Sequence, residues 1–198
     1  MEPHHAAPAR CVLEDFGAPA CRRRPKRGPN RRPGWECPET ACRRPPPLLT
    51  SGCTNSDSHQ MTPEQNKRAV TDAWKAFASR DRQRIEAVFT DDAEWLAPKG
   101  NATAVALGVP DHMIGPAAIA RFLVDDFPRL FVADVAVSFS HLHCDGDTVI
   151  LEERMQATLA GGRRYDNDYC FVFELREGRI ARVREYMDTR KGHAAIFG

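Results

Sequence analysis

Glu185 is the acidic side chain whose neighbours in the sequence are best suited to acid or base chemistry. It shares one face of the last predicted strand, residues 179–188, with Val183 and Met187, because alternate residues of a strand point to the same side. A carboxyl group between two apolar, inward-facing neighbours is partly desolvated, and desolvation raises its pKa towards values that suit proton transfer. We therefore predict a catalytic role for Glu185; the alternative is an ion pair with an arginine of a neighbouring strand.

A second polar pair, Arg154 and Gln156, lies two residues apart in the strand predicted over residues 148–159, so both side chains share one face. Next to Glu185 they could orient a water molecule or bind a carbonyl oxygen, and we predict that they belong to the catalytic site. The opposite face of this strand is about as apolar, which leaves its orientation open. That face carries Leu151, Glu153 and Met155.

Further residues are predicted to bind a ligand. Asn167 and Tyr169 lie on the apolar face of the strand over residues 165–176, where a tyrosine can pack its ring and donate a hydrogen bond to a ligand oxygen. The alternative is that both are core residues. Three aromatic side chains are expected to line the same pocket or the core: Trp74, Trp95 and Phe122. His112 lies in a loop, residues 98–113, that could cover the pocket.

Motifs for metal, phosphate or nucleophilic chemistry are not evident. His141 and His143 share a strand face and could bind a metal as a pair, but the sequence offers no third ligand at a suitable spacing. We find no phosphate-binding glycine loop and no serine or cysteine arrangement typical of nucleophilic catalysis. The sequence therefore predicts a site without a metal.

Three helices are predicted ahead of the strands that carry these residues. The first begins at Thr62, a residue type that caps helices, and Pro63 suits the first turn. Its apolar residues recur at helical spacing: Val70, Trp74 and Phe77. A shorter helix follows Asp81, and a third begins at Gly115 and ends near Pro128.

Between the second and third helices we predict a short strand over residues 91–96 and the loop over residues 98–113. After the third helix only strands are predicted. They cover about residues 135–140, 148–159, 165–176 and 179–188, with glycine-containing turns between the last three. Helices followed by a run of antiparallel strands indicate an α+β fold with the helices packed on one face of the sheet.

The first 60 of the 198 residues differ from the rest in composition. They contain ten of the fifteen prolines and ten Lys or Arg against six Asp or Glu. Such a segment buries too little apolar surface to offset its chain entropy. We predict a disordered tail over residues 1–60, a domain over residues 61–198, and Met61 as the natural initiator.

Composition also bears on location and partners. No apolar run approaches the roughly 18 residues of a membrane-spanning helix, and the N-terminus lacks the order of a signal peptide. We expect a cytoplasmic protein that does not bind a membrane. The arginine-rich run over residues 22–32 could contact nucleic acid, but we interpret it as part of a functionally silent tail.

Five segments resemble, in the same order, the nuclear transport factor 2-like superfamily in its ketosteroid isomerase and SnoaL-like polyketide cyclase branch. They are residues 73–77 (AWKAF), 89–95 (FTDDAEW), 114–119 (IGPAAI), 171–180 (FVFELREGRI) and 184–188 (REYMD). The resemblance implies a cone-shaped, curved antiparallel sheet packed against about three N-terminal helices around a hydrophobic pocket. It also implies a homodimer and a site without a metal or organic cofactor.

For function, the resemblance implies cofactor-free acid or base chemistry of the isomerase, cyclase or hydratase type on a small, hydrophobic, oxygen-bearing molecule. The alternatives are a binding module without turnover and a dimeric interaction protein, because this scaffold hosts many functions. The epoxide hydrolases of the superfamily carry Arg-x-Asp where this chain has Arg154-Met155-Gln156, which disfavours epoxide hydrolysis. Steroid isomerisation is disfavoured because the opening helix lacks the usual tyrosine donor.

Overall fold

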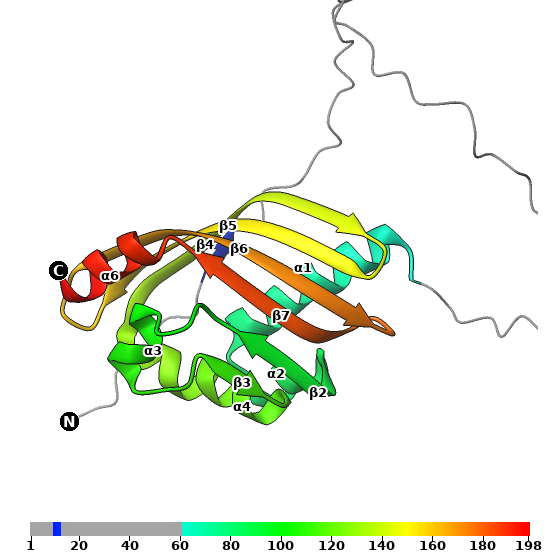
Figure 1. Ribbon diagram of the computed structural model, residues 1–198, viewed down its shortest axis with the longest axis horizontal. Helices are drawn as coiled ribbons and strands as arrows, with labels where there is room; N and C mark the ends of the chain where they lie inside the picture. Colours follow the sequence, from blue (N-terminus) through cyan, green and yellow to red (C-terminus); the bar gives the residue numbers. More distant parts are fainter. Residues whose placement is uncertain (1–9, 13–60) are drawn as a thin grey trace, which may run out of the picture. The chain divides into compact units, whose positions relative to one another are not determined.

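The computed structural model describes residues 10–12 and 61–198. A long, curved antiparallel sheet forms one wall of this part of the chain, and the helices before it in sequence lie against the concave side of the sheet (Figure 1). The predicted α+β fold with a curved sheet is confirmed. The prediction of disorder over residues 1–60 lies outside the described residues except at 10–12, which form strand β1 (Arg10–Val12).

Helix α1 (Pro63–Ser79) begins where the sequence predicts. Thr62 and Gln65 form a reciprocal capping box: the Gln65 backbone N–H donates to Thr62 Oγ1 at 3.2 Å, and the Thr62 N–H donates to Gln65 Oε1 at 2.8 Å. The helix ends at Arg80, whose left-handed backbone lets its N–H donate to the carbonyl of Phe77. Helix α2 (Arg82–Ala87) follows, with the Asp81 side chain as its N-cap.

The segment after strand β2 (Phe89–Leu96) is more regular than the predicted loop over residues 98–113. It contains helix α3 (Ala102–Leu107) and strand β3 (His112–Ile114). Asn101 caps α3, because its Oδ1 accepts a hydrogen bond from the Ala104 N–H at 2.9 Å. A helix of six residues is too short to show a helical period in the sequence, so the prediction of an irregular loop was wrong here.

The third predicted helix is a continuous helical segment made of α4 (Pro116–Arg121), a π-helical turn η1 (Phe122–Asp126) and α5 (Phe127–Leu130). The segment ends at Leu130, close to Pro128 as the sequence predicts, and Pro128 itself lies in the first turn of α5. The wider π-helical turn occurs where the aromatic side chains of this segment meet the sheet.

Four long strands form the meander: β4 (Phe131–Asp145), β5 (Thr148–Leu159), β6 (Arg164–Arg176) and β7 (Arg179–Met187). The strand order of the described sheet is β1-β4-β5-β6-β7-β2-β3. Strand β2 runs parallel to β7, with Trp95 beside Val183, and β3 runs antiparallel to β2. Strand β2 thereby places Trp95 on the inner face of the sheet, next to β7.

The chain does not end in a strand, as the sequence suggested, but in helix α6 (Thr189–Phe197). Asp188 caps this helix, because its Oδ1 accepts a hydrogen bond from the Lys191 N–H at 2.9 Å. Gly192 of α6 lies against Asn167 of β6, where an added Cβ would come within 3.2 Å of the Asn167 Nδ2 atom. Helix α6 therefore packs directly on the sheet. No helix among the described residues is long and apolar enough to cross a membrane.

Candidate active site

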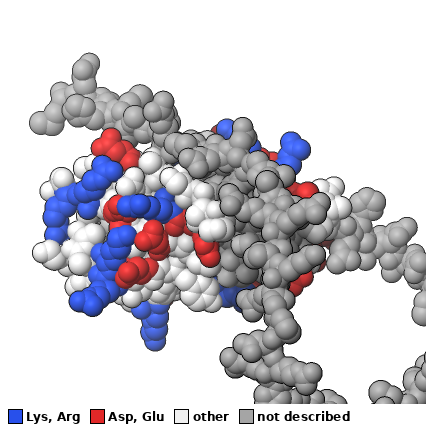
Figure 2. All heavy atoms as spheres, turned by 90° about the horizontal axis from the view of Figure 1, so that it is seen from above, with Lys and Arg blue, Asp and Glu red and all other residues white. Residues whose placement is uncertain are grey.

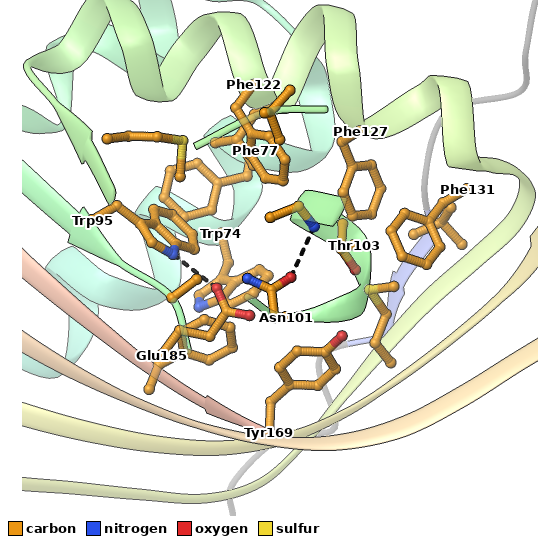
Figure 3. A pocket seen from close by; sticks show the side chains of 18 of the residues that line it. Trp74, Phe77, Trp95, Asn101, Thr103, Phe122, Phe127, Phe131, Tyr169 and Glu185 are labelled. Carbon is orange, nitrogen blue, oxygen red and sulfur yellow. Dashed lines mark hydrogen bonds between the residues drawn. The ribbon is translucent and has the colours of Figure 1, made fainter. Parts of the chain in front are cut away.

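A cavity of about 130 Å³ lies between the inner face of the sheet and the helices. Most of its lining is aromatic or aliphatic, with contributions from α1, the segment around α3, the α4–α5 helical segment and the sheet (Figure 3). The polar lining side chains, tryptophans aside, are Arg80, Asn101, Thr103, Glu153, Tyr169 and Glu185. A few polar groups in an apolar enclosure are typical of small-molecule sites.

Glu185 projects from β7 into this cavity, and Trp95 Nε1 donates a hydrogen bond to its Oε2 at 2.8 Å (Figure 3). Burial raises the pKa of Glu185 from 4.5 to about 7, and the hydrogen bond from Trp95 opposes this rise. Within the described chain no arginine pairs with Glu185, unlike the alternative considered from sequence.

A second carboxyl group, that of Glu153, lines the same cavity from β5. Only 4% of Glu153 is exposed, and its Oε2 has no hydrogen-bond partner among the described residues. Burial, and secondly the charge of Glu185, raises the pKa of Glu153 well above its ordinary value. Both effects favour the protonated form of Glu153, whereas the hydrogen bond from Trp95 favours the carboxylate form of Glu185.

Tyr169 of β6 is directly opposite Glu153 in the sheet pairing and also lines the cavity. Its hydroxyl lies 2.6 Å from that of Tyr165, and Asn167 Nδ2 donates to the Tyr165 hydroxyl at 3.1 Å. Burial raises the pKa of Tyr169 well above its ordinary value, so the phenol stays protonated. Glu153 and Tyr169 are thus two neutral groups able to donate a hydrogen bond close to Glu185.

The other predicted site residues divide into those that line the cavity and those that do not. The predicted aromatic residues Trp74, Trp95 and Phe122 all line it, whereas Asn167 lies fully buried behind Tyr165. His112 was predicted in a cover over the pocket, but its side chain points outwards, with its Nε2 3.3 Å from a Glu94 carboxylate oxygen. In the alternation of β3 it is the next residue, Met113, that faces the cavity.

The predicted placement of Arg154 and Gln156 beside Glu185 is wrong. Both residues lie on the outer face of β5 and hydrogen-bond to Asp166 of β6, with Arg154 Nε at 2.7 Å and Gln156 Nε2 at 3.1 Å from its carboxylate. The Arg154 guanidinium lowers the pKa of Asp166 far below its usual value. In Figure 2, basic and acidic side chains lie next to one another on the visible surface of the described residues.

The sequence of this chain matches the profile of the SnoaL-like domain over residues 70–183. The chain belongs to the SnoaL-like domain family. This assignment confirms the resemblance noted from sequence, and the cavity lies where that resemblance placed a pocket, between the concave sheet and the helices.

Solved structures share the fold of this SnoaL-like domain at low sequence identity. TerC, crystallised with polyporic acid, is 23% identical with a TM-score of 0.59, over 68% of this chain and 99% of that chain. A putative isomerase from Bacillus subtilis is 22% identical with a TM-score of 0.56, over 68% and 95%. An LEH-like epoxide hydrolase from M. tuberculosis is 22% identical with a TM-score of 0.52, over 68% of this chain and 90% of that chain. No curated protein matches the sequence.

Among the residues that the structure describes, no group of three or more His, Cys, Asp or Glu side chains is arranged to hold a metal ion. The two histidines considered from sequence, His141 and His143, stack on each other with ring centroids 6.0 Å apart. His141 also contacts Glu152 through its Nδ1 at 3.0 Å. This pair lies on β4 of the SnoaL-like domain and does not line the cavity.

The hydrogen bond from Trp95 makes a testable contribution to the pKa of Glu185. Because this bond favours the charged carboxylate, Trp95→Phe should raise the pKa of Glu185 above its value of about 7. NMR titration of labelled glutamate carboxyl carbons would measure the change. Trp74→Phe is the matched control, since Trp74 lines the same cavity but its Nε1 has no hydrogen-bond partner in the described chain. An unchanged pKa in Trp95→Phe would contradict the assignment.

Proposed function

We propose that this SnoaL-like domain catalyses cofactor-free proton transfer at a carbon next to a carbonyl group of a small apolar molecule. The observation that carries the proposal is the Glu185 carboxyl, enclosed in an apolar cavity, held by Trp95 at 2.8 Å and with a pKa of about 7. A general base is most effective when its pKa lies near the working pH. Near neutrality about half of Glu185 is ionised, so it can both accept and return a proton.

The neutral donors supply the second half of the chemistry. When Glu185 removes a proton from the carbon, the electron pair of that C–H bond moves to the carbonyl oxygen and makes an enolate. In this proposal the protonated form of Glu153 and the hydroxyl of Tyr169 donate hydrogen bonds to this oxygen. The raised pKa of Glu153 and the presence of both residues in the cavity lining support this role. Fixed donors in a dry site stabilise developing negative charge strongly, and a buried neutral carboxylic acid can be one of them.

The hydrogen bonds behind Tyr169 support this donor role. Asn167 donates to the oxygen of Tyr165, whose hydroxyl lies 2.6 Å from that of Tyr169. In the proposed catalytic arrangement Tyr165 donates to the oxygen of Tyr169, so that the Tyr169 proton is free for the ligand. In a ketone with a β,γ double bond the enolate is a dienolate, and return of the proton from Glu185 to the γ carbon completes an isomerisation. Where the molecule has a second carbonyl, the enolate carbon forms a C–C bond to it, the electron pair of that C=O bond moves to its oxygen, and the proton on Glu185 goes to this oxygen to complete a cyclisation.

Exchange of carbon-bound protons tests the proposal without knowledge of the natural substrate. The full chain would be incubated in D2O with 2-tetralone, an apolar ketone with acidic protons next to its carbonyl, and exchange followed by NMR. We expect the wild type to accelerate exchange over buffer. Glu185→Gln should remove this acceleration, with a loss of about 100-fold or more, the usual contribution of a general base.

Glu177→Gln is the control, since it removes the same charge from an exposed turn outside the cavity. It should exchange the ketone at the wild-type rate. Exchange that is equally fast in Glu185→Gln, or no faster in wild type than in buffer, would overturn the proposal. Binding of 2-tetralone without exchange would favour the second function that the apolar lining supports, a ligand-binding module without turnover.

A further inference from the structure

Arg80 is the one basic residue in the lining of the cavity. It follows directly after α1 and belongs to the helix wall, whereas Glu153 and Glu185 belong to the sheet wall. Its side chain is half-buried, and burial lowers the pKa of the guanidinium. A cation that has lost part of its hydration needs a partner of opposite charge or a set of hydrogen-bond acceptors.

Within the described chain the Arg80 side chain makes no hydrogen bond and no ion pair, in contrast to its neighbour Arg82. Arg82, two residues further on, contacts Asp125 of the helical segment with its Nη2 at 2.8 Å. Most other arginines of the described chain have acidic partners on the surface, for example Arg176, Arg179 and Arg184. Arg80 differs from them in facing the cavity.

The backbone at Arg80 is in the left-handed region, with a φ of 54°, at the position after a helix where glycine is the usual residue. This conformation ends α1, because it lets the Arg80 N–H donate to the carbonyl of Phe77. Asp134 and Glu177 have similar positive φ values but do not line the cavity, so it is the place of Arg80 in the cavity wall that sets it apart from them.

We infer that Arg80 binds an anionic oxygen group of the ligand, so that the cavity selects apolar carboxylates and similar acids over neutral molecules. The inference rests on the proposed function, since it names the substrate class for the same cavity. A guanidinium pairs with a carboxylate through two parallel N–H donors, which fixes the orientation of the ligand. With its acidic group at the helix wall, the ligand directs its other end to Glu185 and Glu153 on the sheet wall.

Paired ligands that differ only in charge test this inference. Binding of 2-naphthoate and of 2-naphthamide to the full chain would be measured by titration calorimetry at neutral pH. We expect the wild type to bind naphthoate at least about tenfold more tightly than the amide, the strength of a charge-assisted hydrogen bond. Arg80→Gln should remove this preference and leave amide binding within about twofold. Arg80→Lys should retain part of the preference for naphthoate, because lysine keeps the positive charge but lacks the two parallel N–H donors of the guanidinium.

Arg84→Gln is the matched control, because it removes the same charge from the exposed side of α2, outside the cavity. It should keep the preference for naphthoate. No preference in the wild type, no measurable naphthoate binding, or an equal loss of both ligands in Arg80→Gln would overturn the inference. Binding does not require turnover, so Glu185→Gln should keep the preference. If Glu185→Gln loses ketone exchange but the wild type shows no preference for naphthoate, the proposed function stands and the role of Arg80 is refuted.

Discussion

At about pH 8, Glu185→Gln is expected to be more stable than the wild type by about 3 kcal/mol. The reason is the difference between the ordinary pKa of this carboxyl, 4.5, and its value of about 7 in the folded chain. The folded protein holds a proton that the unfolded chain releases readily. Above pH 7 the folded state must therefore carry a poorly solvated carboxylate, whereas glutamine stays neutral.

The sign of the pH dependence follows from the raised pKa. Below about pH 4.5 both the folded and the unfolded chain are protonated at Glu185, and wild type and variant should have similar free energies of unfolding. As the pH rises from about 4.5 to about 7, only the unfolded chain gives up this proton, so the wild type loses stability. Above about pH 7 the difference between the two proteins stays constant.

Urea unfolding of both proteins at several pH values from acid to alkaline would measure this difference. Glu177→Gln serves again as the control, because an exposed carboxyl outside the cavity should change the free energy of unfolding by no more than about 0.5 kcal/mol. A difference between Glu185→Gln and wild type that is the same at acid and alkaline pH would contradict a raised pKa at Glu185. A Glu185→Gln protein that is more stable but no longer exchanges protons would show the usual trade-off between stability and activity at a catalytic group.

The order and type of the long elements could be predicted from the sequence because each has a period of its own. Helix α1 and strands β5, β6 and β7 are long enough for the alternation of apolar and polar residues to distinguish helix from strand. Helix α3, strand β3 and helix α6 were not predicted. Helix α3 has six residues and α6 mixes alanine, lysine and histidine without a clear apolar stripe, so their stability comes from capping and from packing on the rest of the domain.

The candidate site was only half predicted, for a reason that lies in β5. Arg154 and Gln156 occupy the positions where epoxide hydrolases of the superfamily carry Arg-x-Asp, and over residues 151–156 the two faces of the strand are about equally apolar, so the sequence left the orientation open. Over the full length of β5, the face opposite Arg154 and Gln156 is the more apolar of the two. It carries Val149, Leu151, Glu153, Met155, Ala157 and Leu159, all of them buried. A shift of one residue exchanges the two faces of a strand, so Glu153 was missed, whereas the predicted neighbours of Glu185 placed it on the face of β7 that lines the cavity.

Arg80 was missed for a different reason. It follows the last residue of α1, and a lone arginine at a helix end has an unremarkable sequence context. Its distinction comes from its place in the cavity wall, which is not visible in the periodicity of the sequence. Residues whose role depends on the geometry of a helix end are therefore the ones that sequence patterns identify least well.

Glu153→Leu is expected to slow the exchange of 2-tetralone by about 100-fold, whereas Glu153→Gln should stay within about tenfold of the wild type. The proposed role of Glu153 is that of a neutral donor, and a glutamine amide also donates a hydrogen bond. Leucine has a similar volume but no donor, so the enolate oxygen would lose one of its two stabilising contacts. The rates would be measured by the same NMR exchange experiment, below saturation and near saturation with ketone.

Both substitutions should leave the protein folded, because the Glu153 carboxyl has an Oε2 atom without a partner in the described chain, and replacement of such a group by an apolar side chain is close to neutral or stabilising. A normal melting temperature with slow exchange in Glu153→Leu would therefore report on chemistry rather than on folding. Equal losses in the leucine and glutamine variants would instead mean that Glu153 acts through its charge. In that case Glu153 would be the base, and Glu185, with its bond from Trp95, the group that tunes it.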